Sequence, residues 1–102
     1  MWSIEAIKDA NRRAGKHWFE PGTMRFFASR VGSTVYQGPG GVYFVSSERF
    51  IPSRGDPTPR RYTLRRFDPA TGGVETASPF NRWSRGRAIR MAKAYARMAP
   101  TT

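Results

Sequence analysis

The sequence has no cysteine and only one histidine among its 102 residues. Without cysteine the chain can form neither disulfides nor thiolate metal sites, and it has no cysteine nucleophile. No stretch approaches the roughly 18 apolar residues of a membrane span, and the first residues lack the apolar segment of a secretion signal. These absences favour a cytoplasmic chain, and at this length residues 1–102 are expected to form a single domain around one core.

Acidic residues are also scarce. Seven aspartates and glutamates stand against 18 lysines and arginines, which gives a formal net charge of +11. Only Lys8, Lys16 and Lys93 are lysines, and the planar guanidinium of arginine suits bidentate pairing with phosphate. High genomic G+C content explains part of the arginine excess but not the shortage of acids. The charge balance therefore indicates a negatively charged partner, either nucleic acid or an acidic protein surface.

Groups that could carry out catalysis are few and scattered. His17 stands next to Trp18, and a lone histidine in such a place is usually a packed or solvated side chain. The acidic residues lie far apart, so an enzyme would need a pocket that gathers His17 with acids from distant segments. No motif supports three converging metal ligands. We therefore expect no enzymatic activity, no cofactor and no metal site.

The segment from Ser84 to Met98, SRGRAIRMAKAYARM, predicts an amphipathic helix. Its apolar face carries Ala88, Met91, Ala92, Tyr95 and Ala99, with Ile89 and Met98 at the margins, and its opposite face is basic. Ser84 is a suitable N-cap, whereas the arginines that follow lie at the positive end of the helix dipole. Cations in that place are unfavourable for the helix itself, so they point to an anionic partner.

The remaining chain predicts a second helix and several strands. We expect a helix at Ser3–Ala14 and strands at Met24–Val31, Ser33–Gln37, Val42–Ser46, Arg60–Phe67 and Val74–Ala77. Turns are expected at Pro21-Gly22, at Gly38–Gly41 and at Asp68–Gly73, with a long surface loop over Ser46–Pro59 pinned by Phe50-Ile51. This order predicts an α+β fold: an N-terminal helix, a four- or five-stranded antiparallel sheet, and a C-terminal basic helix, with the helices packed on one face of the sheet.

Arginines alternate with aromatic residues in two places, the expected fourth strand and the start of the last helix. If these two segments are neighbours, their cations form one patch suited to phosphate contacts. We interpret the aromatics Tyr62, Phe67 and Trp83 as core residues rather than base-stacking ones. The candidate nucleic-acid-binding residues are Arg60, Arg61, Arg65, Arg66, Arg82, Arg85, Arg87, Arg90, Lys93 and Arg97.

Several segments resemble a family of small uncharacterised proteins carried by bacteriophages and plasmids. They are HWFEPGTMRFFASRV, VYFVSSERF, RRYTLRRFDPATGG and SRGRAIRMAKAYA, which together span nearly the whole chain. The family has no established activity, so the resemblance implies an origin in a mobile element more than a mechanism.

A looser similarity is to double-stranded-RNA-binding domains, which share the order helix, three strands, helix. There the start of the last helix lies on phosphates across a groove, and Arg85, Arg87 and Arg90 would take that part here. The chain departs from that pattern in its extra hairpin, in lacking a matching first-loop histidine, and in having Ser-Arg-Gly-Arg in place of a lysine cluster.

Two functional hypotheses follow from these features. The first is a non-enzymatic protein that binds duplex DNA or RNA largely without sequence preference. The alternative is an accessory or inhibitory protein that docks on an acidic surface of a host protein, with Phe27, Phe50 and Ile51 as candidate anchors.

Overall fold

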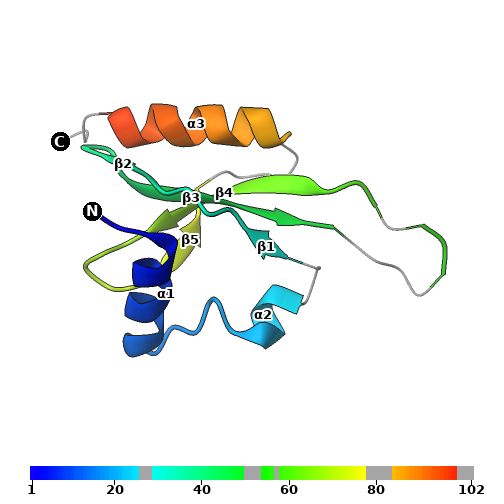
Figure 1. Cartoon of the computed structure of the whole chain (residues 1–102), viewed down its shortest axis with the longest axis horizontal. Coiled ribbons are helices and arrows are strands. Elements are labelled where there is room, and N and C mark those ends of the chain that lie inside the picture. Colours follow the sequence, from blue (N-terminus) through cyan, green and yellow to red (C-terminus); the bar gives the residue numbers. More distant parts are fainter. Residues whose placement is uncertain (26–28, 50–53, 57, 78–83, 99–102) are drawn as a thin grey trace.

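Helices lie on both faces of an antiparallel sheet (Figure 1). The computed structural model describes residues 1–25, 29–49, 54–56, 58–77 and 84–98. Along the chain the elements are α1 (Ile4–Arg13), α2 (Pro21–Arg25), β1 (Arg30–Val31), β2 (Tyr36–Gly38), β3 (Gly41–Glu48), β4 (Arg61–Phe67), β5 (Val74–Thr76) and α3 (Arg85–Arg97). This order confirms the predicted α+β class.

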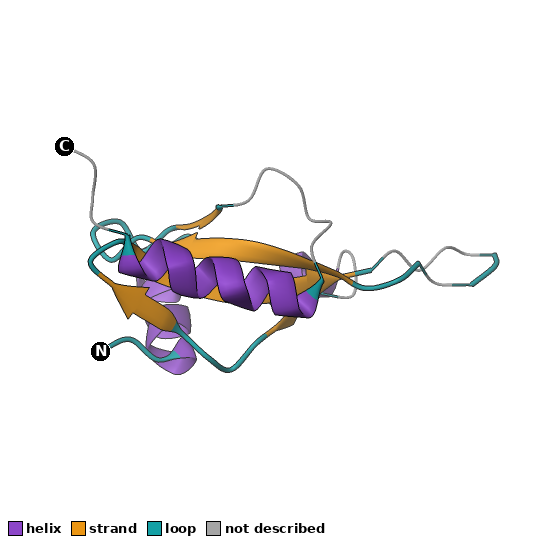
Figure 2. Cartoon of the chain, turned by 90° about the horizontal axis from the view of Figure 1, so that it is seen from above, coloured by secondary structure: helices purple, strands orange, loops and turns teal. Residues whose placement is uncertain are grey.

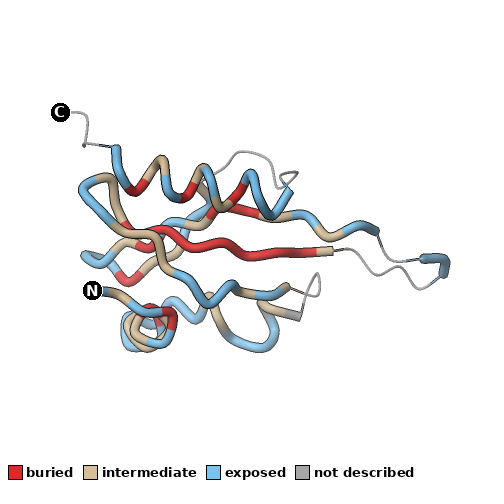
Figure 3. Tube along the Cα trace, turned by 45° about the horizontal axis from the view of Figure 1, so that its top comes forward, coloured by how far each residue is buried: buried red, intermediate tan, exposed pale blue. Residues whose placement is uncertain are grey.

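Strand β3 is the centre of the sheet. The strand order is β1-β3-β4-β5, and β2 also pairs with β3, so that β3 contacts three other strands. The β2–β3 hairpin closes where Gly38 pairs with Gly41, which confirms the predicted turn. Every residue of β3 from Val42 to Glu48 is buried, as the continuous red tube in Figure 3 shows. A strand buried along its whole length is covered on both faces.

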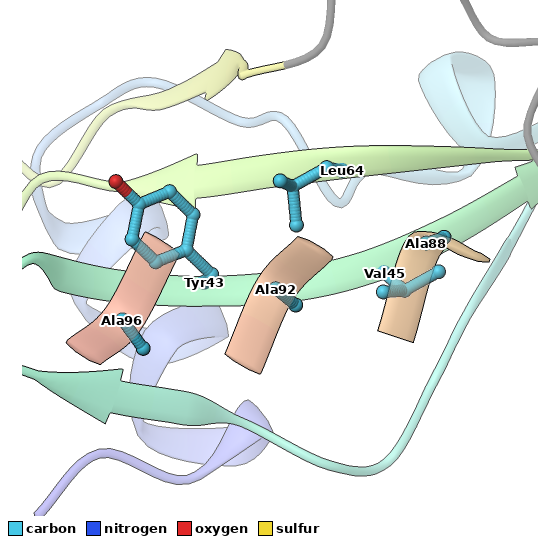
Figure 4. Packing of buried hydrophobic residues seen from close by; sticks show 6 residues of the cluster. All are labelled: Tyr43, Val45, Leu64, Ala88, Ala92 and Ala96. Atoms are coloured by element: carbon cyan, nitrogen blue, oxygen red, sulfur yellow. The ribbon is translucent and has the colours of Figure 1, made fainter. Parts of the chain in front are cut away.

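Helix α3 covers one face of the sheet. Its buried residues are three alanines four positions apart, Ala88, Ala92 and Ala96, and they lie over Tyr43, Val45 and Leu64 (Figure 4). Because alanine is small, the helix axis can lie close to the strands. The β2–β3 turn also contacts the far end of the helix, where the Gly40 N–H donates to the Ala96 carbonyl at 3.0 Å.

Helix α1 and the segment after it cover the other face. Ile4 and Ile7 of α1 pack with Val42, Phe44 and Phe67 of the sheet. Trp18 and Phe19 add to this second core, with ring centroids 5.8 and 5.7 Å from that of Phe44. The prediction that the helices pack on one face is therefore wrong. Alternate residues of β3 are apolar on both sides, so each face needs its own cover (Figure 1).

The predicted strand at Met24–Val31 is also wrong in its first part. A short helix, α2, occupies Pro21–Arg25, and the strand is limited to Arg30–Val31. Pro21 has the fixed φ that suits the first position of a helix, and the Met24 N–H donates to the Glu20 carbonyl at 3.0 Å. An apolar alternation this short cannot by itself separate strand from helix.

Strand β3 continues to Glu48, two residues beyond its predicted end at Ser46 and into the predicted loop at Ser46–Pro59. The predicted strand at Ser33–Gln37 begins later, at Tyr36. The candidate anchors Phe27, Phe50 and Ile51 lie outside the described residues, and so does Trp83, which was interpreted as a core residue.

Candidate functional site

The outer surface of α3 is basic. Ser84 caps the helix, as predicted: its hydroxyl accepts a hydrogen bond from the Arg87 N–H at 3.2 Å. The helix lies along the top of the sheet, so the side opposite its alanines faces outward (Figure 2). No acidic residue occurs in its sequence, and all its cations are exposed: Arg85, Arg87, Arg90, Lys93 and Arg97.

A pocket of about 260 Å³ opens where the start of α3 lies near the ends of the central strands. Three arginines from three separate segments line it: Arg30 of β1, Arg60 just before β4, and Arg85, the first residue of α3. None of the described residues that line this pocket is acidic. We call it the arginine pocket.

Strand register brings the arginines of this pocket together. Arg30 pairs with Ser47, and Ser47 pairs on its other side with Tyr62. The Arg60 Nη1 donates to the carbonyl oxygen and to the Oγ of Ser47, both at 3.0 Å. Ser47 therefore holds the Arg60 guanidinium next to β1, the strand that carries Arg30.

The arginines of the pocket lie close enough to affect one another. Partial burial lowers the pKa of Arg60, and repulsion from Arg30 and Arg49 lowers it further. The Nε of Arg49 is itself buried without a hydrogen-bond partner among the described residues. The Glu48 carboxylate offsets part of the repulsion at Arg60, and a bound anion would relieve the rest.

The remaining walls of the arginine pocket are aromatic, aliphatic and hydroxylic. Tyr36 and Tyr62 are half-buried and pack against the core beneath α3. Ile89 of α3 contributes aliphatic surface, and Ser33 and Thr34 contribute hydroxyl groups from the β1–β2 connection. The pocket thus combines positive charge with apolar surface.

A second hollow lies further along the same side of α3. Tyr36 lines both hollows, and Lys93 and Arg97 line the second one. Cations therefore line this side of α3 from its first residue to its last. The β1–β2 connection runs alongside the helix on the same side (Figure 2).

Two of the candidate arginines are held in ion pairs of the sheet. The Arg65 Nη2 lies 2.9 Å from Glu48 Oε1, on the face covered by α1, and its Cζ lies 5.2 Å from the centre of the Trp18 ring. On the other face, Arg66 Nη1 lies 3.1 Å from Glu75 Oε1 at the sheet surface. Arg65 in particular is committed to contacts within the fold.

The other candidates divide by position. Arg61 is exposed at the start of β4, in register with Glu48 and so on the α1 side of the sheet. Arg82 lies outside the described residues. Arg60 and the cations of α3 do lie together, on the α3 side. Sequence reasoning missed Arg30 and Tyr36, because their place in the pocket depends on strand pairing that no local pattern reveals.

Ion pairing differs between the two sides of the sheet. On α1 each acid is paired: Glu5 with Lys8 at 3.8 Å, and Asp9 with both Arg12 and Arg13. In contrast, several cations of the α3 side form no ion pair with any described residue: Arg30, Arg85, Arg90, Lys93 and Arg97.

His17 is exposed in a left-handed backbone conformation, with a φ of 53°, and its Nδ1 lies 3.2 Å from Glu20 Oε1. In the described ranges, histidines and acidic residues form no cluster of three that could hold a metal ion. Across the same ranges no helix has the length and apolar character to cross a membrane.

These features define an α+β fold with one strongly basic helical face. The sequence matches the model of a family described as "Family of unknown function (DUF7447)" over residues 3–94, so the chain belongs to that family. No curated protein and no solved structure matches it. Membership confirms the resemblance to an uncharacterised family. The origin in a mobile element and the similarity to double-stranded-RNA-binding domains stay predictions.

Proposed function

We propose that this protein binds nucleic acid through the basic surface over α3, without catalysis and largely without sequence preference. The surface, which we call the α3 face, comprises seven cations: Arg30, Arg60, Arg85, Arg87, Arg90, Lys93 and Arg97. The excess of positive charge on α3 supports this proposal. Acids on the opposite side are already paired with neighbouring cations, whereas the α3 helix has five cations and no acid.

The dimensions of α3 suit a phosphate backbone. A helix of 13 residues is about 20 Å long, which corresponds to about six phosphates along one strand of a duplex. Contacts to phosphates fix the position of a protein on nucleic acid but carry little sequence information. No asparagine or glutamine occurs on α3 to read adenine edges, in keeping with weak sequence preference.

The proposal also includes a cytoplasmic location and an origin in a bacteriophage or plasmid. The matched family is one of unknown function and supports neither point.

The alternative is docking on an acidic host protein. Its candidate anchors lie outside the described residues, and only the cations of the α3 face support it.

Fluorescence polarisation with labelled duplex DNA, single-stranded DNA and duplex RNA tests the proposal. The variant Arg90→Gln/Lys93→Gln removes two exposed cations of the α3 face, and Arg12→Gln/Arg13→Gln removes two exposed cations of α1 as the matched control. We expect the first to weaken binding on the order of tenfold and the second to change it little. Equal weakening by both variants would contradict the proposed surface. No binding of wild type to any of the three nucleic acids at low salt would favour the protein-partner alternative.

A further inference from the structure

The arginine pocket differs from the rest of the α3 face because it is hollow. Cations along the outer side of α3 can touch phosphates only from an exposed helix surface. In the pocket, Arg30, Arg60 and Arg85 converge from three segments on a volume of about 260 Å³. That volume lies just below the usual range for small-molecule sites, so it suits one nucleotide unit but not a duplex.

The charge of the pocket favours a phosphate with two negative charges. A phosphodiester inside a strand carries one charge, whereas a terminal phosphomonoester carries about 1.5 to 2 at neutral pH. Three guanidinium groups, with no acid among the described lining residues, match the dianion better. Arg60 is also held in advance by its two hydrogen bonds to Ser47, so less freedom is lost when it binds.

The uncharged walls suit the rest of a nucleotide. Tyr36 and Tyr62 offer aromatic rings, and Ile89 and Val45 offer aliphatic surface beside the arginines. Bases stack on aromatic side chains without strict regard to identity. A free inorganic phosphate would use the arginines but leave these apolar walls uncovered.

We propose that the arginine pocket binds a nucleotide that bears a terminal phosphomonoester, with the phosphate on Arg30, Arg60 and Arg85 and the base against the tyrosines. The source of this nucleotide is either the phosphorylated end of a nucleic-acid strand or a free mononucleotide. Binding of a strand end rests on the proposed function, since the α3 face would hold the rest of the strand.

The test compares one labelled single-stranded oligonucleotide in three forms: 5′-phosphorylated, 3′-phosphorylated and without terminal phosphate. We expect wild type to bind at least one phosphorylated form roughly tenfold more tightly than the unphosphorylated form, since hydrogen bonds between charged groups are strong. The pocket variant Arg30→Gln/Arg85→Gln should lose this preference. The control Arg90→Gln/Arg97→Gln removes two α3 cations that do not line the pocket. It should weaken all three forms together and keep the ratio.

Nuclear magnetic resonance with a nucleoside 5′-monophosphate, the matching nucleoside and inorganic phosphate separates the two sources. One outcome is that the monophosphate shifts the Ile89 methyl resonances, the nucleoside and inorganic phosphate do not, and the protein does not discriminate among the oligonucleotides. That outcome would support a free nucleotide as the ligand. Discrimination among oligonucleotides that depends on the pocket would support a strand end. Equal affinity for the three oligonucleotides with no shift by the monophosphate would overturn the inference, yet salt-dependent binding of all three would still support the proposed function. If wild type binds no oligonucleotide, the proposed function fails, and the monophosphate titration alone decides the inference.

Discussion

Glu48 and Arg65 form an ion pair in the second core, and its loss should strongly destabilise the protein. Their side chains are 9% and 16% exposed, and 2.9 Å separates Glu48 Oε1 from Arg65 Nη2. The carboxylate also accepts from the hydroxyls of Ser46 at 2.7 Å and Thr63 at 2.9 Å. Glu48→Ala removes these acceptors and leaves the guanidinium buried without a counter-charge. We expect this variant to lose about 3–5 kcal/mol of unfolding free energy.

Arg65→Met tests whether the loss comes from the unpaired charge. The double variant Glu48→Ala/Arg65→Met should be more stable than Glu48→Ala alone, with a coupling energy of about 2 kcal/mol or more in a double-mutant cycle. Urea unfolding followed by tryptophan fluorescence measures each free energy. The exposed pair Arg66–Glu75 is the control, and Arg66→Met should cost under about 1 kcal/mol. If the losses of unfolding free energy from Glu48→Ala and Arg65→Met simply add in the double variant, this reasoning is refuted.

Three further predictions concern uncharged single residues. Gly40→Ala should cost about 1–3 kcal/mol in urea unfolding, because a Cβ there would lie 1.9 Å from the Tyr95 carbonyl oxygen; an unchanged midpoint would contradict this close approach. Gly86→Ala should stabilise the protein by about 0.5–1 kcal/mol, since the added methyl meets nothing within 4 Å and alanine favours the helix. Its melting temperature should rise by several degrees, and a fall would refute the helix assignment at that position. Asn11→Ala should cost about 1–3 kcal/mol, because Asn11 is 1% exposed and its side chain bonds both the Gly72 carbonyl and the Trp18 N–H; undiminished hydrogen-exchange protection of the Trp18 amide would contradict this role.

Local features of the sequence were sufficient to predict the elements that depend on short-range chemistry. The helix expected over Ser84–Met98 is α3, because a long alanine-rich stripe and a serine cap are both local signals. The glycines at Gly38–Gly41 predicted the β2–β3 turn for the same reason. The strand expected from Met24 failed, because Pro21 begins a helical turn there and the apolar run was too short to exclude one.

The candidate site was only partly predictable. The basic stripe of α3 follows from helical periodicity alone. The arginine pocket depends on β1 pairing with β3 so that Arg30 stands opposite Ser47, and pairing between distant segments leaves no local pattern. Likewise, Glu48 was expected in a loop, so its pairing with Arg65 could not be foreseen, and Arg65 was grouped with the binding residues.

The salt dependence of nucleic-acid binding tests the central claim most directly. Wild type and the two double variants, Arg90→Gln/Lys93→Gln and Arg12→Gln/Arg13→Gln, are titrated with the same duplex DNA at several salt concentrations. If about six cations of the α3 face contact phosphates, log K falls with log salt at a slope of roughly −5. The α3 variant should reduce the magnitude of that slope by about 2, and the α1 variant should leave it unchanged. A wild-type slope near zero, or equal slopes for wild type and the α3 variant, would contradict binding through the α3 face.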